Sequence, residues 1–221
     1  MHRCRIAWRA LQRIEAEPDR WDAVFWLDGD MQAPVPWVRE LFDLVTLVAA
    51  CRPKPVDDQV DAEEAKHWTE DDLAAWRRRN APALVGAYVK RNDPDVMACR
   101  HTTPKIPPLK VTVDRGDGPR KYELPAVVSG MGCMMQTREA FVAHCHEAPL
   151  IKNWGTDEFG AVCSAGPGKS TDGTWAWSSE DWTYTSWEWQ SGRGVYLVRH
   201  AIFGHVGESI HYPTADTKIE D

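Results

Sequence analysis

Two aspartates separated by one glycine, Asp28 and Asp30, have the residue types and spacing best suited to chemistry in this chain. They follow residues 23–27, an apolar run between polar ends that predicts a strand buried on both faces of a parallel sheet. Ligands bind at the carboxyl ends of such strands. Because two neighbouring carboxylates repel each other unless a cation is near, the pair predicts a divalent metal site. The alternative is an ordinary Asp-Gly-Asp turn.

Two further motifs carry groups that can act in catalysis. Glu180 and Asp181 open a predicted helix over 178–190, where free backbone N–H groups stabilise carboxylates. A general base and a pair of plain capping acids are equally good interpretations of these two residues. His205 lies in a glycine-flanked segment near the end of the chain, which gives an imidazole access to a ligand. A structural role is the commoner one for a lone histidine, and metal ligation is the alternative.

Two glycine-containing segments are candidates for binding. Gly130 and Gly132 interrupt an apolar strand over 127–135, and a helix follows from about residue 137. Because glycine lets the backbone approach a ligand closely, this turn is a candidate binding segment. Residues 152–178 are rich in Gly, Ser, Thr and Trp and show little periodicity, which predicts a long lid-like loop.

The remaining pattern predicts one catalytic domain over residues 1–221. An acidic, partly helical insertion is expected at about 53–80. Apolar periodicity and turn signals predict the other elements, which are helices at 5–16, 37–50 and 73–79, strands at 84–90 and 195–198, and a hairpin joining 109–113 to 120–124.

Composition indicates a packed globular protein, with 43% hydrophobic and 27% charged residues. The six cysteines form no Cys-x-x-Cys pair, so we expect reduced thiols in the cytoplasm and no zinc ribbon. We expect no signal peptide and no membrane span. The run His144-Cys145-His146 is interpreted as part of a helix surface, because neighbours on a helix point in different directions.

The net charge of −7 is unevenly distributed. Residues 57–72 hold eight acids against one lysine, and residues 77–121 hold eleven bases against four acids. A basic segment of this kind suits a diphosphate or a polyanionic acceptor. A solvated face that balances the acidic segment is the favoured interpretation.

Taken in order, these motifs resemble the glycosyltransferase A-type fold, especially family-2-like and related bacterial or phage-type transferases. Residues 21–31 look like the family's strand ending in the metal motif, and 128–141 look like its glycine-containing donor and acceptor segment. Residues 179–182, 194–197 and 204–207 resemble its Glu-Asp helix, following strand and terminal histidine. The resemblance implies an α/β, Rossmann-like, mostly parallel central sheet flanked by helices. The sheet is expected to be N-terminally shortened, without the strands that cradle the nucleotide base.

The resemblance also implies a function, namely metal-dependent transfer of a sugar from a nucleotide-sugar donor to an acceptor hydroxyl. Asp30 would ligate Mn²⁺ or Mg²⁺, Asp28 would bind the ribose or a metal-bound water, and His205 would complete the site. His200 is a weaker rival for that last role. An inverting outcome is favoured over a retaining one, and in it Asp181 would be the base.

Glu180 would orient that base. The residues expected to contact donor or acceptor are Tyr88, Gly130, Met131, Gly132 and Trp182, with Arg5 or Arg9 on phosphate. The acceptor stays open among a glycan, a protein, a lipid and a modified nucleic-acid base, and so does the oligomeric state. Two alternatives are a metal-dependent hydrolase and a non-catalytic, carbohydrate-binding remnant of a transferase.

Overall fold

A computed structural model describes residues 2–51, 67–102, 105–114, 118–148, 150–152, 158–160, 163, 165–169, 175–207 and 209–220. The helices are α1 (His2–Ala16), η1 (Pro18–Arg20), α2 (Val35–Cys51), α4 (Glu70–Arg79), α5 (Arg138–Glu147) and α6 (Glu180–Gln190). The strands before α5 are β1 (Ala23–Leu27), β2 (Met31–Gln32), β3 (Ala83–Ala87), β4 (Val89–Lys90), β5 (Asp93–His101), β6 (Leu109–Asp114), β7 (Pro119–Leu124), β8 (Val127–Ser129) and β9 (Cys133–Thr137). They are followed by β10 (Leu150–Lys152), β11 (Glu158–Gly160), β12 (Gly166–Lys169), β13 (Trp175–Ser178), β14 (Val195–Ile202), β15 (Gly204–Val206), β16 (Ile210–His211) and β17 (Lys218–Glu220).

The central sheet has the strand order β1-β9-β3-β14. Strands β1 and β3 each pair antiparallel with β9, and β14 pairs parallel with β3. Three of the four strands therefore run in one direction, with β9 reversed between β1 and β3. The chain is a mixed α/β protein with several smaller sheets of mixed strand direction beside the central one.

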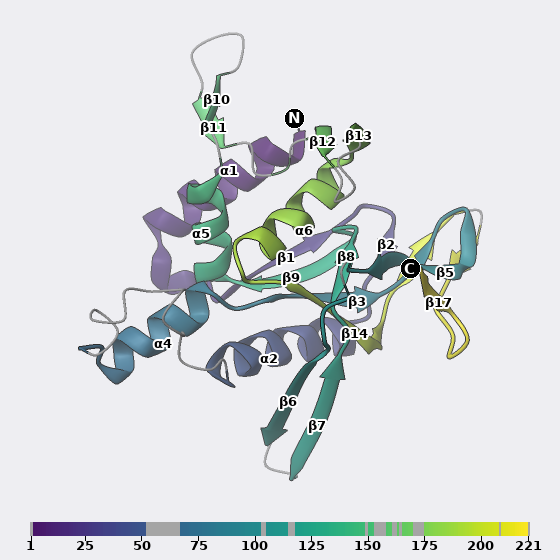
Figure 1. Ribbon diagram of the computed structural model, residues 1–221, viewed down its shortest axis with the longest axis horizontal. Helices are drawn as coiled ribbons and strands as arrows, with labels where there is room; N and C mark the ends of the chain where they lie inside the picture. Colours follow the sequence, from purple (N-terminus) through teal and green to yellow (C-terminus); the bar gives the residue numbers. More distant parts are fainter. Residues whose placement is uncertain are drawn as a thin grey trace.

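Helices cover both faces of this sheet (Figure 1). Helices α1, α5 and α6 lie above it in that view, over a core that includes Leu11, Val85, Phe141 and Tyr184. Helix α2 lies below it and packs Leu41, Leu44, Val45 and Val48 against the opposite face. Successive residues of β1 alternate between the two cores, because neighbouring side chains of a strand point to opposite faces.

The helix starts follow from local capping. Thr137 and Ser179 are the N-caps of α5 and α6, and each hydroxyl accepts a hydrogen bond from a backbone N–H in the first turn. Thr69 forms a reciprocal capping box with Asp72 at the start of α4. These caps fix the point at which each helix begins. For α6, that point places Glu180 and Asp181 in the first turn.

Two small sheets contain strands from the end of the chain. Strand β15 pairs antiparallel with β2, with His205 opposite Met31. Strand β17 pairs parallel with β5, which also pairs with β4 and β8. The hairpin β6–β7 projects from the body, at the bottom of Figure 1. The pairing of β15 with β2 carries His205 to the turn that follows β1.

Two predicted segments need comment. The lid-like loop at 152–178 contains paired strands within its described residues, since β12 pairs antiparallel with β13. The lid-like loop stays a prediction, and the Gly- and Pro-rich composition of β12 hides this pairing from the sequence. In the acidic insertion at 53–80, residues 52–66 lie outside the described residues and α4 forms most of the rest. No described helix combines the length and apolar character needed to cross a membrane.

Candidate functional site

The turn after β1 is held from two sides. The Asp28 N–H donates to the carbonyl of Gly132 over 3.1 Å, and the Met31 N–H donates to the carbonyl of Asp28 over 3.1 Å. The Val206 N–H donates to the carbonyl of Asp30 over 2.8 Å. The segment before β9 and strand β15 thus fix the backbone of both predicted metal-binding aspartates.

His205 and Asp30 lie side by side at this turn. The distance between His205 Nε2 and Asp30 Oδ2 is 3.3 Å, and His205 Nδ1 lies 2.8 Å from the carbonyl oxygen of Val89. A carbonyl only accepts hydrogen bonds, so Nδ1 carries the proton in that contact. In the neutral ring, Nε2 then presents a lone pair to the Asp30 carboxylate. Two acceptors face each other there unless a proton or a metal cation lies between them.

Asp28 belongs to a second group, on the α1 side. Its Oδ1 lies 2.6 Å from Nη2 of Arg3. The same guanidinium bonds to Asp181 through Nη1, and its Nε lies 3.3 Å from Glu180 Oε1. Arg3 therefore joins the end of β1 to the N-terminus of α6, and we call Arg3, Asp28, Glu180 and Asp181 the carboxylate cluster.

Burial and neighbouring charges have opposite effects on the pKa values of two groups in the carboxylate cluster, Asp181 and Arg3. Burial raises the pKa of the Asp181 carboxyl; the Arg3 guanidinium opposes this, and the charges of Asp28 and Glu180 add to it. Burial alone would lower the pKa of the Arg3 guanidinium, but the three carboxylates around it raise that pKa. Asp181 is thus a carboxylate whose proton affinity exceeds that of an ordinary aspartate.

Tyr88 is packed between the two groups. Its hydroxyl oxygen accepts a hydrogen bond from the Gly132 N–H over 3.2 Å, and its ring meets that of His205 edge-on, with centroids 6.0 Å apart. A Cβ atom at Gly130 would lie 2.5 Å from the Tyr88 hydroxyl oxygen and 3.5 Å from Asp181 Oδ2. A Cβ at Gly132 would lie 2.9 Å from the same ring. Both glycines therefore leave room for Tyr88.

The other predicted contact residues differ in exposure. Met131 is buried in the core, so its side chain faces no ligand. Trp182 is half-buried, and the guanidinium of Arg100 lies 4.4 Å from its ring centroid. Arg5 and Arg9 lie on the exposed side of α1.

Arg3 is the arginine of α1 that reaches acidic groups in the site, and sequence reasoning missed it. The signal was the buried stripe of α1, formed by Cys4, Ala7, Leu11 and Ile14. Arg3 stands one helical turn before Ala7, so it continues this inward-facing stripe at the N-terminus.

Two other histidines that the sequence singled out, His200 and His144, contact glutamates outside the turn after β1. His200 contacts Glu40 of α2, with Nε2 and Oε1 2.9 Å apart. His144 is buried, not on a helix surface as predicted, and its Nδ1 bonds to the buried Glu188. The local pattern failed because His144 faces α6, and helix periodicity does not reveal which polar residue finds a buried partner.

Asp30 and His205 are the candidate metal donors at this turn. No group of three or more His, Cys, Asp or Glu side chains within the described residues is arranged to hold a metal ion. Asp30 and His205 nevertheless offer one oxygen and one nitrogen donor at a partly exposed position. Mg²⁺ and similar ions are often held by one or two protein groups plus substrate phosphates. The pair would supply two ligands to such a cation, and its other ligands would have to come from outside the described side chains.

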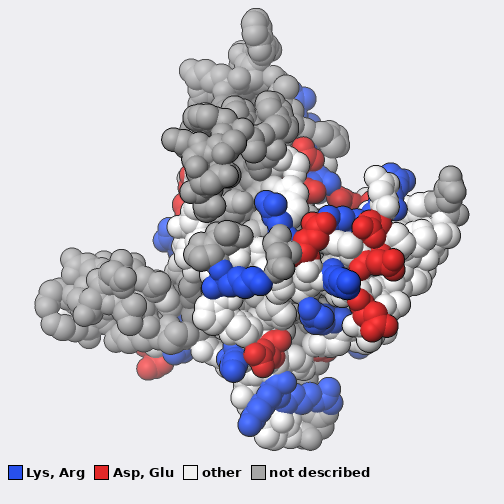
Figure 2. Space-filling view, turned by 45° about the vertical axis from the view of Figure 1, so that its right-hand side comes forward, with Lys and Arg blue, Asp and Glu red and all other residues white. Residues whose placement is uncertain are grey.

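Two grooves, of about 560 and 940 Å³, lie beside α2, and neither is lined by Asp28, Asp30, Asp181 or His205. Figure 2 shows basic and acidic side chains interspersed over one face of the body. Basic side chains gather at the projecting hairpin, which carries Lys110, Arg120 and Lys121. Bases of the segment 77–121 also pair with acids, since Arg78 lies 3.2 Å from Glu139 and Lys90 lies 2.5 Å from Glu220.

Comparisons with known proteins found no match among protein-family models, curated proteins or solved structures.

Proposed function

We propose that the chain is a metal-dependent glycosyltransferase that moves a sugar from a nucleotide-sugar to an acceptor hydroxyl. The observation that carries the proposal is the meeting of Asp30 with His205, with the His205 Nδ1 proton directed at a carbonyl. Residues 175 positions apart in sequence form this contact. The shared direction of β1, β3 and β14 supports a Rossmann-like sheet with these groups at the end of β1.

Asp30 Oδ2 and His205 Nε2 would hold the cation. Val89 fixes the ring orientation, as backbone carbonyls commonly do for metal-binding histidines. When bound, Mn²⁺ or Mg²⁺ would neutralise the diphosphate and act as a Lewis acid toward the leaving group. Asp28, which Arg3 engages through Oδ1, would contact the ribose or a metal-bound water.

Asp181 would accept the proton of the acceptor hydroxyl in an inverting reaction. Its Oδ1 bonds to Arg3, and its Oδ2 lies on the side of Gly130, 3.5 Å from the position that a Cβ atom of this residue would take. The raised pKa of Asp181 makes the ionised carboxylate a stronger base than an ordinary aspartate. Glu180, paired with the same guanidinium, would keep Arg3 and so Asp181 in place. The buried Tyr88 would shield this side of the site from water.

The proposed acceptor class remains broad: a glycan, a protein, a lipid or a modified nucleic-acid base. A cytoplasmic location is proposed with it, supported by six cysteines that are all free.

A screen of nucleotide-sugars by thermal shift, with and without Mn²⁺, tests the proposal. Specific binding to the folded protein raises the melting temperature. We expect one donor to give a Mn²⁺-dependent rise that is lost in Asp30→Ala and kept in Asp19→Ala, a control in the exposed turn η1. Release of free sugar from that donor without any acceptor would favour the hydrolase. A shift without turnover on any acceptor would favour a non-catalytic binding protein.

A further inference from the structure

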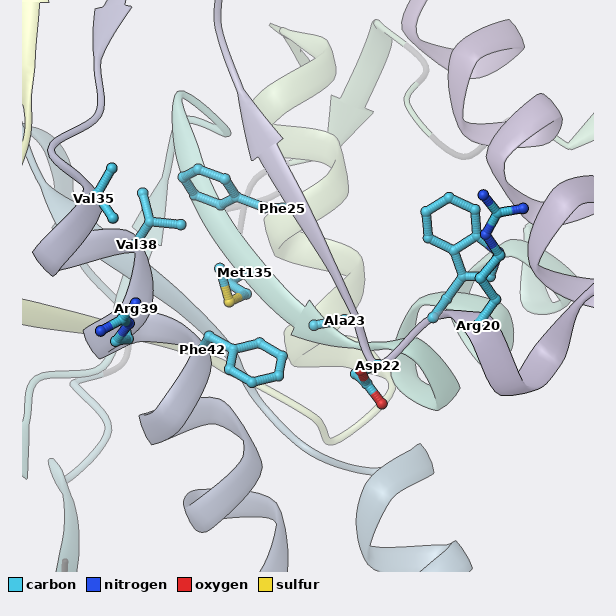
Figure 3. Close-up of a pocket in the computed structure, with 10 residues that line it drawn as sticks. Arg20, Asp22, Ala23, Phe25, Val35, Val38, Arg39, Phe42 and Met135 are labelled. Atoms are coloured by element: carbon cyan, nitrogen blue, oxygen red, sulfur yellow. The ribbon is translucent and has the colours of Figure 1, made fainter.

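Strand β1 leaves one edge of the central sheet open. Among the described strands of that sheet, β9 is its neighbour on one side and none lies on the other. A groove of about 560 Å³ runs between β1 and α2 on this side of the molecule (Figure 3). Its apolar lining consists of Trp21, Ala23, Phe25, Val35, Val38, Phe42 and Met135. Open sheet edges are normally short, covered or protected by charge, so an apolar groove beside such an edge is a candidate contact surface.

The apolar side chains of the groove are unusually accessible. Val35 is 70% exposed, and Phe42 and Trp21 are each 37% exposed. Large apolar side chains gathered at one exposed site mark a contact surface. They come from α2 and from the segment before β1, so the surface spans two elements that are fixed by the core beneath.

The charges at the groove indicate what covers it. Asp22 and Arg39 both line it, and within the described residues neither side chain has an ion pair or a hydrogen bond. Arg20, at the Asp22 end, is paired with Glu17 over 2.7 Å. In Figure 3, Asp22 and Arg39 lie on opposite sides of the apolar side chains. The groove therefore has an unpaired acid at one end, an unpaired base at the other and apolar groups between.

We propose that two copies of this chain associate through this groove about a two-fold axis. In a two-fold contact, the same surface meets itself in reversed direction. Reversal brings Asp22 of each copy to Arg39 of the other and stacks the two sets of apolar side chains. The interface thus gains two ion pairs around an apolar centre, the usual anatomy of a protein contact. This proposal is independent of the proposed transferase activity.

Sedimentation equilibrium of the full chain, over micromolar to submillimolar concentrations, tests the proposal. The unmodified protein should be a dimer in reversible equilibrium with monomer. Asp22→Arg and Arg39→Asp should each weaken the dimer by about tenfold or more, because each places like charges together at two positions. Arg9→Asp, a charge reversal on the exposed side of α1, should leave the dissociation constant unchanged. Circular dichroism of each variant establishes that it is folded.

Mixing the two variants gives the decisive result. A heterodimer of Asp22→Arg with Arg39→Asp has both opposite-charge pairs restored, so the equimolar mixture should associate more tightly than either variant alone. The double variant in one chain should also recover self-association. A monomer at every concentration would overturn the proposal. So would a dimer that both single variants leave unchanged, or a mixture that associates no better than its components.

Discussion

The guanidinium of Arg3 bonds to the carboxylate of Asp181, and so ties the first turn of α1 to the first turn of α6. The two residues are 178 positions apart. Arg3 acts against burial in setting the proton affinity of Asp181, because its positive charge favours the ionised carboxylate.

Replacing Arg3 should therefore change the titration of Asp181. Arg3→Gln removes the positive charge that lowers the pKa of Asp181. That pKa should therefore rise further, and deprotonation of Asp181 should move to higher pH. Carbon-13 NMR of the aspartate carboxyl carbons, assigned with Asp181→Asn, measures this without any activity assay. Arg9→Gln is the matched control. Unchanged titration in Arg3→Gln would refute the coupling. If Asp181 is the catalytic base, the acid limb of the activity profile should move the same way.

Substitution of the two glycines tests their role beside Tyr88. Gly130→Ala and Gly132→Ala should each destabilise the protein by about 1–3 kcal/mol, because the new methyl group overlaps the Tyr88 side chain. Gly29→Ala is the control, since no atom lies within 4 Å of its Cβ position. Adding Tyr88→Phe should reduce the cost of Gly130→Ala, since the hydroxyl is the group overlapped. Equal stabilities of all three alanine variants by urea unfolding would contradict this account.

A buried ionic network holds the other end of α6. Arg193 Nε lies 3.1 Å from Glu188 Oε2, and its two terminal nitrogens bind Glu147 at 3.1 and 2.8 Å. Glu188 also bonds to His144. Arg193→Met should cost about 3–5 kcal/mol, because it leaves the fully buried Glu188 without its cation. Arg199→Met, at an exposed position of β14, should cost little. Similar melting temperatures for the two variants would be the contrary result.

The cysteines should differ sharply in reactivity. Cys51 is exposed, and the other five are buried. Burial raises the pKa of Cys99 to about 12 and raises that of Cys133 well above its usual range, so these thiols stay protonated and unreactive. A chromogenic disulfide reagent should titrate one thiol rapidly in the native protein and six after denaturation. Cys51→Ser should abolish the fast phase; a fast phase that survives would show that a buried thiol becomes accessible.

Much of the fold could be predicted from local signals. The helix after Pro34, predicted at 37–50, is α2 (Val35–Cys51), and the hairpin predicted at 109–124 is β6 with β7. The helices predicted from about residue 137 and over 178–190 are α5 (Arg138–Glu147) and α6 (Glu180–Gln190), because helix starts depend on short-range signals that the sequence displays directly.

Strand direction and long-range polar contacts could not be predicted in the same way. The apolar run of β9 is similar to that of β1, although the two strands are antiparallel. Burial sets the apolar pattern of a strand, and the direction of the strand does not. The strand β5 begins with Asp-Pro-Asp and was missed for lack of an apolar start. The pairing of Arg3 with Asp181 depends on how α1 docks on α6. In the candidate site, residue types indicated Asp28, Asp30, Asp181 and His205. They did not indicate that Arg3 binds Asp28 and Asp181 in one group, apart from Asp30 and His205.

The most direct test of the central claim is calorimetric titration of Mn²⁺ into the protein in the presence of a nucleoside diphosphate. We predict one Mn²⁺ site that is lost in Asp30→Ala and in His205→Ala and retained in Asp19→Ala. Mn²⁺ binding must be lost in both variants, because each residue supplies one donor to the same ion. Mn²⁺ binding that is unchanged in Asp30→Ala and His205→Ala, or absent from the unmodified protein, would contradict the account.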